Sequence, residues 1–204
     1  YVLDDGWFGA RRNDHAGLGD WTVSTEVWPH GLHPLVDKVT GLGMEFGLWF
    51  EPEMINLDSA IARAHPDWIM STGGRLPVES RHQQVINLGL PECYAYIRDA
   101  MLDILAEYKI SYIKWDHNRD LIDAGSAPDG RPGVHEQTLA FYRLVDELTE
   151  KCKDDAGQSK DRPEHRITSP RHAYISAQGR DGTVGVVAGP VFPAFTRETS
   201  QRAP

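Results

Sequence analysis

The six residues from Lys114 to Arg119 place a lysine and a carboxylate at the end of an apolar run, where both could take part in chemistry. The run alternates in side-chain direction, so Lys114 and Asp116 are expected on one face together with Ile110 and Tyr112. Charged groups are costly on a buried face unless they are paired or face a ligand at the open end of a strand. The pattern therefore predicts a site, although a structural ion pair between Lys114 and Asp116 is the simpler alternative.

A lysine beside Asp116 would favour the ionised carboxylate. An ionised carboxylate can act as a nucleophile or stabilise a cation, but it cannot donate a proton. Cleavage of a glycosidic bond with retention needs a second carboxyl group, protonated and roughly 5 Å from the first.

Three other segments end in residues that could reach the same strand-end cavity. Asp4 and Asp5 close the first apolar run, and at least one of them is expected to face the cavity, unless Asp5 only caps the following turn. Trp49 lies near the end of a second run, where its indole could bind the apolar face of a sugar or simply belong to the core. Arg81 lies in the loop before a third run and could also reach the cavity.

A metal site is not predicted. Glu51, Glu53, Asp4 and Asp5 offer oxygen ligands for magnesium or calcium, but Lys114 would compete with a cation there. The nine histidines show no spacing of the H-E-x-x-H kind. We also predict no cofactor.

Two smaller predictions concern residues next to these motifs. His117 is expected to point away from the Asp116 face and to serve in packing. Arg11 and Arg12 are expected to be solvated.

The composition limits the possible partners and compartments. The chain has 204 residues, of which 40% are hydrophobic and 25% charged, and its formal net charge is -9, which argues against a nucleic-acid partner. It has no apolar run of the roughly 20 residues that span a membrane and no signal-like start, so we predict a cytoplasmic protein without membrane contact. Cys93 and Cys152 suggest idle thiols in a reducing compartment.

Strand-like runs at 1–5, 44–51, 84–88 and 110–116 alternate with helical stripes, which predicts an α/β fold with a parallel sheet. The stripes recur every three or four residues and consist of Leu35, Val36, Val39 and Leu42; of Ile97, Met101, Ile104, Leu105 and Tyr108; and of Phe141, Leu144, Val145, Leu148 and Cys152. Two long loops, 9–33 and 118–133, follow strands at their carboxyl ends, where such folds place their sites.

The sequence pattern changes near residue 152. Residues 1–152 carry the alternating pattern, and they are predicted to form one catalytic unit. Residues 153–204 form a divergent tail with little signal for either helix or strand, apart from a weak strand at 184–191, and disorder is the expectation for it.

Five motifs, in this order, are similar to the catalytic domain of family 36 α-galactosidases. They are Asp4-Asp5-Gly6-Trp7-Phe8, Leu18-Gly19-Asp20-Trp21, Gly47-Leu48-Trp49-Phe50-Glu51-Pro52-Glu53-Met54, His65-Pro66-Asp67-Trp68 and Lys114-Trp115-Asp116-His117-Asn118-Arg119. The resemblance covers about residues 1–152.

The resemblance implies a (β/α)8 TIM barrel that hydrolyses terminal α-galactosides such as melibiose and raffinose with retention and without a metal. It implies that Asp116 is the nucleophile. It also implies a set of residues that bind the galactose ring and its hydroxyls, namely Asp4, Asp5, Trp49, Arg81 and Lys114.

The chain departs from the family pattern after residue 152. The family's Cys-Ser-Ser-Gly-Gly-Gly-Arg stretch and the Ser-Asp motif with the acid/base aspartate are missing, and Asp181 is a weak substitute. A TIM barrel needs on the order of 250 residues, so we expect a partial barrel, about the first half, in a truncated fragment with little or no activity. A non-catalytic, galactose-binding remnant is the alternative.

Three further expectations follow from the resemblance. Action on α-N-acetylgalactosaminides and galactosyl transfer remain alternatives within the same class of enzyme. A homo-oligomer is possible for the full-length enzyme. A half barrel would expose sheet edges that favour association.

Overall fold

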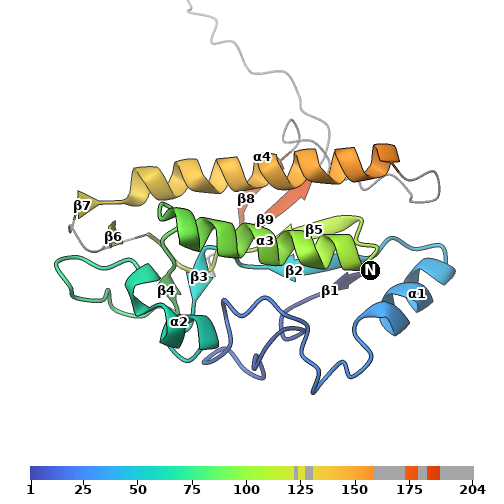
Figure 1. Cartoon of the computed structure of the whole chain (residues 1–204), viewed down its shortest axis with the longest axis horizontal. Coiled ribbons are helices and arrows are strands. Elements are labelled where there is room, and N and C mark those ends of the chain that lie inside the picture. Colours follow the sequence, from blue (N-terminus) through green and yellow to red (C-terminus); the bar gives the residue numbers. More distant parts are fainter. Residues whose placement is uncertain (122–123, 127–130, 159–172, 179–182, 189–204) are drawn as a thin grey trace, which may run out of the picture.

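The computed structural model describes residues 1–121, 124–126, 131–158, 173–178 and 183–188. Its centre is a parallel sheet of three strands in the order β1-β2-β5 (Figure 1), which are β1 (Val2–Leu3), β2 (Gly47–Phe50) and β5 (Tyr112–Trp115). Leu3 pairs with Leu48, and Phe50 pairs with Trp115. The strands therefore end at one edge of the sheet, and the predicted α/β class is confirmed.

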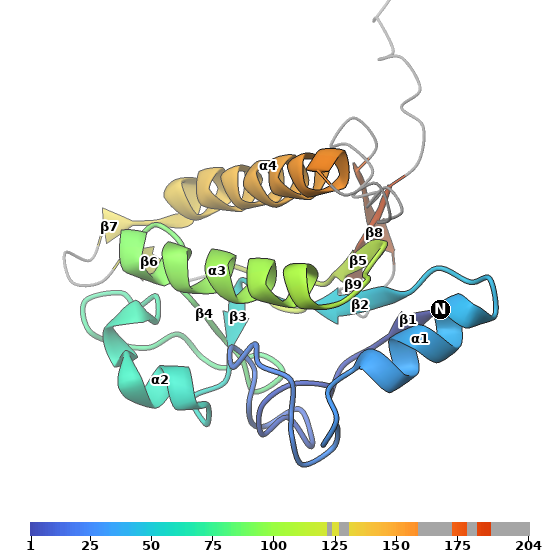
Figure 2. The same cartoon turned by 45° about the vertical axis from the view of Figure 1, so that its right-hand side comes forward.

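Helices lie between these strands and after β5, and the periodicity predicted the three longest of them. They are α1 (His33–Gly41), the short α2 (Ala60–Ala64), the 3-10 turn η1 (Pro66–Trp68), α3 (Pro91–Glu107) and α4 (Val134–Gln158). Helices α3 and α4 pack side by side in both views (Figures 1 and 2). The three predicted apolar stripes lie on α1, α3 and α4, or at the residue that ends the helix.

Local sequence explains where α2 and α3 begin. Pro91 opens α3, because a proline fits the first turn, where its missing N–H is not needed. Helix α2 begins after Ser59, whose hydroxyl accepts a hydrogen bond from the N–H of Ala62. The carboxylate of Asp20 also accepts hydrogen bonds from the first two N–H groups of α2. This cap fixes the loop after β1 against α2.

The run at 84–88 was wrongly predicted as a strand of the parallel sheet. Only β4 (Gln84–Val85) forms there, and it pairs antiparallel with β3 (Met54–Ile55) in a separate two-stranded sheet. The periodicity of a run indicates that it is buried, but it does not indicate which strand the run will pair with. The chain after β2 turns back at residues 51–53 and supplies the nearer partner.

Two short hairpins lie outside the parallel sheet. The first, β6 (Gly125–Ser126) with β7 (Arg131–Pro132), lies within the predicted long loop. The second, β8 (Ala173–Gln178) with β9 (Thr183–Ala188), lies in the predicted tail, and β9 lies close to β5. The predicted strand 184–191 overlaps β9, β8 was not predicted, and α4 continues through the predicted boundary at residue 152.

An aromatic cluster forms the core around β2. Its rings are almost fully buried, and their centroids lie between 4.5 and 6.2 Å apart; they belong to Trp7, Phe8, Trp21, Trp49 and Phe50. Large aromatic side chains bury the most apolar surface per residue, so this cluster gives the strand ends a rigid base.

Within the described residues, none of the helices combines the length and the apolar character that a membrane crossing requires.

Candidate active site

The carboxylate of Asp116 is held at the carboxyl end of β5 by three N–H donors. Its Oδ2 accepts hydrogen bonds from Trp49 Nε1 at 3.1 Å and from Asn118 Nδ2 at 2.7 Å. Its Oδ1 accepts one from the backbone N–H of His117 at 3.0 Å. Asp116 is 5% exposed, so the carboxylate is fixed in orientation and largely screened from bulk water.

Asn118 connects this carboxylate to two further polar groups. Its backbone N–H donates to Glu51 Oε1 at 2.6 Å, and its side-chain oxygen accepts a hydrogen bond from Arg81 Nη1 at 2.6 Å. Glu51 Oε2 in turn accepts a hydrogen bond from Gln83 at 3.0 Å. Asp116, Asn118, Glu51 and Trp49 thus form one connected set, called here the Asp116 group.

Glu51 is fully buried, and its ionisation is strongly perturbed. Burial first, and then the nearby charge of Asp116, raise the pKa of Glu51 to about 7, against the hydrogen bonds from Asn118 and Gln83 that lower it. Such a pKa suits a proton donor at neutral pH. However, both oxygens of Glu51 already accept hydrogen bonds, and no part of the side chain reaches the surface, so Glu51 supports Asn118 and does not meet a substrate.

Lys114 pairs with Asp4 and not with Asp116. Lys114 Nζ lies 2.6 Å from Asp4 Oδ2. The strand register explains why Lys114 meets Asp4. Lys114 pairs with Trp49 on β2, and the pairing of Leu3 with Leu48 brings Asp4, the next residue, level with Trp49. Partial burial raises the pKa of Asp4, but the Lys114 ammonium and the N–H of Asp5 outweigh that effect and lower it. The alternative of a structural ion pair between Lys114 and Asp116 is therefore wrong, and Lys114 orients Asp4.

Asp5 is paired with Arg11, which was wrongly predicted to be solvated. Arg11 is 4% exposed, and its guanidinium meets both oxygens of Asp5, with Nη2 2.8 Å from Oδ2 and Nε 2.9 Å from Oδ1. Arg11 also donates to the buried side chain of Asn56 at 3.0 Å. Two adjacent arginines are typical of an exposed surface. The carboxylate of Asp5, which pairs with Arg11 in its buried position, lies six residues earlier.

Trp49 and Arg81 contact the Asp116 group through hydrogen-bond partners that the sequence did not indicate. Trp49 is 2% exposed, stacks on Phe8 with ring centroids 6.0 Å apart, and presents its N–H to Asp116. Arg81 and His82 both adopt the left-handed backbone conformation, with φ of 52° and 61°, which non-glycine residues rarely adopt. This bend carries the Arg81 side chain to Asn118.

Glu53 and His117 form a neighbouring pair. Glu53 Oε2 lies 3.2 Å from His117 Nδ1 and 3.3 Å from Trp115 Nε1. Burial alone would lower the pKa of His117, but the contact with Glu53 and the charges of Glu51 and Asp120 raise it. The His117 ring therefore turns toward Glu53, in line with the prediction that it points away from the Asp116 face.

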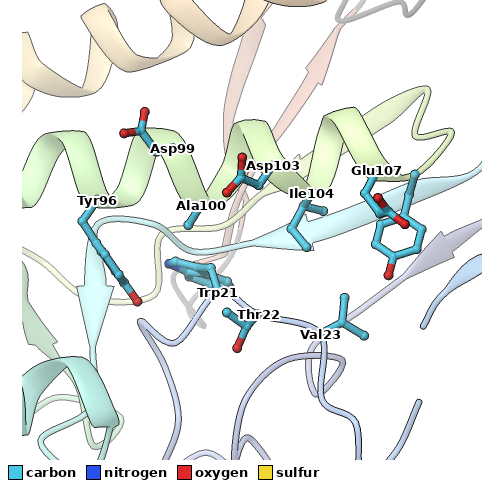
Figure 3. A pocket seen from close by; sticks show the side chains of 10 residues that line it. Trp21, Thr22, Val23, Tyr96, Asp99, Ala100, Asp103, Ile104 and Glu107 are labelled. Atoms are coloured by element: carbon cyan, nitrogen blue, oxygen red, sulfur yellow. The ribbon is translucent and has the colours of Figure 1, made fainter. Parts of the chain in front are cut away.

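The hollow shown in Figure 3 lies apart from these residues. It measures about 660 Å³ and lies between α3 and the segment around Trp21. Asp99, Asp103 and Glu107 line it from α3, but Asp99 pairs with Arg98 at 2.7 Å and Glu107 contacts His33 at 2.7 Å. No residue of the Asp116 group lines this hollow, so we place the candidate active site at the strand ends.

Comparisons with known proteins identify the family of this chain. The family model described as Melibiase matches residues 1–156. An alpha-galactosidase of Escherichia coli is 48% identical over 151 residues, which cover 74% of this chain and 21% of that protein. Alpha-galactosidase Mel36A of Lactobacillus acidophilus is 44% identical, over 76% of this chain and 22% of that protein.

Solved structures give the same result. The GH36 alpha-galactosidase AgaB from Geobacillus stearothermophilus superposes with a TM-score of 0.70 at 41% identity, over 74% of this chain and 21% of that one. A variant of AgaA from the same organism, solved in complex with raffinose, gives a TM-score of 0.69 at 40% identity, over the same shares of both chains. The chain thus spans about a fifth of the length of the relatives it matches. With the family model matching about three quarters of its residues, and with its motifs assembled at the ends of parallel strands, this chain belongs to the melibiase family.

Proposed function

We propose that this chain carries the nucleophile of a retaining glycoside hydrolase that acts on terminal α-D-galactosyl residues, as in melibiose and raffinose-type oligosaccharides. The relatives named as alpha-galactosidases support the reaction class, and the complexes of AgaA variants with raffinose and stachyose support the substrate class. The observation that carries the proposal is the Asp116 carboxylate, fixed by three N–H donors at the end of β5.

In the proposed mechanism, an oxygen of Asp116 attacks the anomeric carbon, the glycosidic bond breaks, and the leaving oxygen takes up a proton from a general acid, a role to which no residue of this chain is assigned. Water then cleaves the β-galactosyl ester and restores the original anomeric configuration. Asp116 Oδ2 already accepts two hydrogen bonds and Oδ1 only one, so Oδ1 keeps a free lone pair and is the attacking atom.

The residues around Asp116 would bind the sugar. Asp4 and Asp5, each oriented by a cation, accept hydrogen bonds from galactose hydroxyls. Lys114 and Arg81 donate to hydroxyls, and Trp49 forms a wall of the sugar site. These roles follow from the family resemblance together with the positions of the side chains near the strand ends.

The three βα units of the described chain fit the beginning of a (β/α)8 barrel. The parallel order β1-β2-β5 with intervening helices supports a partial barrel over residues 1–152, although α4 runs on to Gln158, past the predicted start of the divergent segment 153–204. Asp181, the weak candidate for the acid/base residue, lies outside the described residues.

Galactose binding without hydrolysis is the second candidate function. One observation favours it: among the described residues near Asp116, Asp4 and Asp5 are paired with cations and Glu51 is fully buried. None of these three carboxyl groups is available as a protonated acid.

A mechanism-based label separates the two candidates. An α-galactosyl fluoride with a second fluorine on the sugar ring releases fluoride without needing a proton, so it tests Asp116 independently of the general acid. We expect mass spectrometry to find one galactosyl unit per chain on the peptide that contains Asp116, and excess galactose to prevent the labelling. The exposed Asp120→Asn variant is the matched control and should be labelled like the unaltered chain.

Each outcome decides between the candidates. Labelling on Asp116 supports the hydrolase. Galactose binding without labelling would support the binding protein and overturn the nucleophile assignment. A folded chain that neither binds galactose nor reacts would overturn both.

A further inference from the structure

Two histidines and an aspartate meet on the surface, outside the Asp116 group. Asp14 and His15 lie in the loop after β1, and His82 lies in the loop before β4. One ligand atom from each of the three residues lies within 4.8 Å of the other two. The His15 and His82 rings stack with centroids 3.6 Å apart, and His15 Nε2 lies 3.5 Å from Asp14 Oδ1. These residues form the His15–His82 cluster.

A buried amide holds the two loops together beneath this cluster. Asn56 is fully buried, and its Nδ2 donates to the backbone carbonyl of His82 at 2.8 Å and to that of Asp14 at 3.1 Å. Its Oδ1 accepts hydrogen bonds from the Leu18 N–H at 2.9 Å and from Arg11 at 3.0 Å. Every hydrogen-bonding position of this amide is used. The backbones that carry the cluster are therefore fixed, while the three side chains stay exposed.

The backbone at His82 gives independent support. His82 adopts φ of 61° and follows Arg81 at φ of 52°, although neither residue is glycine. Strained conformations of this kind persist where the surrounding structure imposes them, and they gather at ligand sites and clamps. The bend accounts for the contact of Arg81 with Asn118, and it also turns His82 onto His15.

The donor set selects the kind of ligand. Two imidazole nitrogens and one carboxylate oxygen suit zinc, copper, nickel or cobalt, whereas magnesium and calcium prefer sites made of oxygen alone. Bonds of about 2.0–2.1 Å in a tetrahedral zinc site place ligand atoms about 3.4 Å apart. The exposed side chains must therefore rotate inward to meet an ion. The chain's formal net charge of -9 favours the approach of a cation.

We propose that Asp14, His15 and His82 bind one divalent transition-metal ion, with water completing its coordination. The inference does not depend on the proposed function, because none of the three residues belongs to the Asp116 group. The ion would link the loop after β1 to the loop that carries Arg81. It would therefore stabilise the folded chain in proportion to its concentration.

Calorimetric titration of Zn²⁺ into the tag-free chain, after removal of metal with a chelator, tests the proposal. We expect one ion per chain and at least tenfold weaker binding in His15→Gln and in His82→Asn, since asparagine tolerates the left-handed backbone at that position. His30→Gln alters an exposed histidine outside the cluster and should bind zinc like the unaltered chain.

Electron paramagnetic resonance of bound Cu²⁺ gives a second measurement. The expected spectrum shows coupling to two imidazole nitrogens in the unaltered chain and to one in each histidine variant. If His82→Asn does not fold, as judged by circular dichroism, His15→Gln carries the test. Failure to bind zinc at about millimolar concentration, unchanged affinity in the folded variants, or a single nitrogen ligand in the unaltered chain would overturn the proposal.

Discussion

The two halves of the strand-end site hold their carboxylates in opposite ways. Asp116 is nearly buried and is fixed by neutral donors, namely an indole, a side-chain amide and a backbone N–H. Asp4 and Asp5 are more exposed and are each fixed by a cation, Lys114 in one case and Arg11 in the other.

The contrast teaches how one sheet edge can supply two kinds of carboxylate. Neutral donors fix the orientation of Asp116 without cancelling its charge, so the full charge can face a positive centre that develops on a sugar. A cation partner cancels much of the charge on Asp4 and Asp5 but leaves lone pairs that can accept hydrogen bonds. The first arrangement suits a reaction, and the second suits recognition.

Asp116→Asn should have the largest effect on the labelling rate of all the variants proposed. The amide keeps the size of the side chain but loses the charged nucleophile, so we expect the labelling rate to fall by at least about 10³-fold. Galactose affinity should change by less than about tenfold, because Asp4 and Asp5 are intact. Labelling that persists in this variant would place the reacting group elsewhere.

Glu51→Gln should change how stability depends on pH. The pKa of Glu51 is raised from 4.5 to about 7, so its contribution to the free energy of unfolding is present below pH 4.5 and is lost as pH rises through 7. Between pH 4.5 and 8 the unaltered chain should lose about 3 kcal/mol that the variant does not lose.

Urea unfolding at a series of pH values measures this difference. Glu45→Gln, at an exposed glutamate, is the control and should follow the unaltered chain. Parallel pH profiles for Glu51→Gln and the unaltered chain would show that Glu51 ionises normally.

Asn118→Ala tests how much the neutral donors contribute to the reactivity of Asp116. It removes one of the three hydrogen bonds to Asp116, and hydrogen bonds to charged groups contribute about 1.5–3 kcal/mol. We therefore expect the labelling rate to fall about tenfold to a hundredfold. Arg81→Gln removes the exposed contact to Asn118 and one proposed donor to a sugar hydroxyl, but no hydrogen bond to Asp116, and should cost less than about fivefold, measured by the same mass-spectrometric time course. Equal losses in both variants would mean that Arg81, and not the amide, controls Asp116.

Lys114→Met should have the smallest effect on stability. The ion pair with Asp4 is partly exposed and screened by solvent, so its loss should lower the free energy of unfolding by less than about 1 kcal/mol. The pKa of Asp4 should rise from its lowered position toward the ordinary value, and nuclear magnetic resonance titration of the Asp4 carboxyl carbon would follow it. A pKa that does not move would mean that the backbone N–H of Asp5 is sufficient to lower it.

The sequence predicted the elements of the fold better than their pairing. Helices α1, α3 and α4 follow from stripes that recur every three or four residues, because one buried face is a local property. The prediction that β4 joins the parallel sheet was wrong, because strand pairing depends on distant segments that the local sequence does not specify.

The site shows the same division between local and distant information. Asp116, Asn118 and Trp49 lie within short motifs and were visible in the sequence. The pairing of Lys114 with Asp4 depends on strand register, and the burial of Arg11 depends on Asp5 and Asn56. The His15–His82 cluster joins two loops far apart in sequence, so a search for spaced ligand motifs could not find it.

The indole of Trp49 has an optical consequence. Its N–H bonds to Asp116 Oδ2, and its ring is enclosed by Phe8 and Trp21. Esterification of Asp116 would remove a negative charge from the immediate surroundings of the excited indole. Emission from this single tryptophan, obtained by subtracting the spectrum of Trp49→Phe, would then report formation of the covalent intermediate in real time, without any dye.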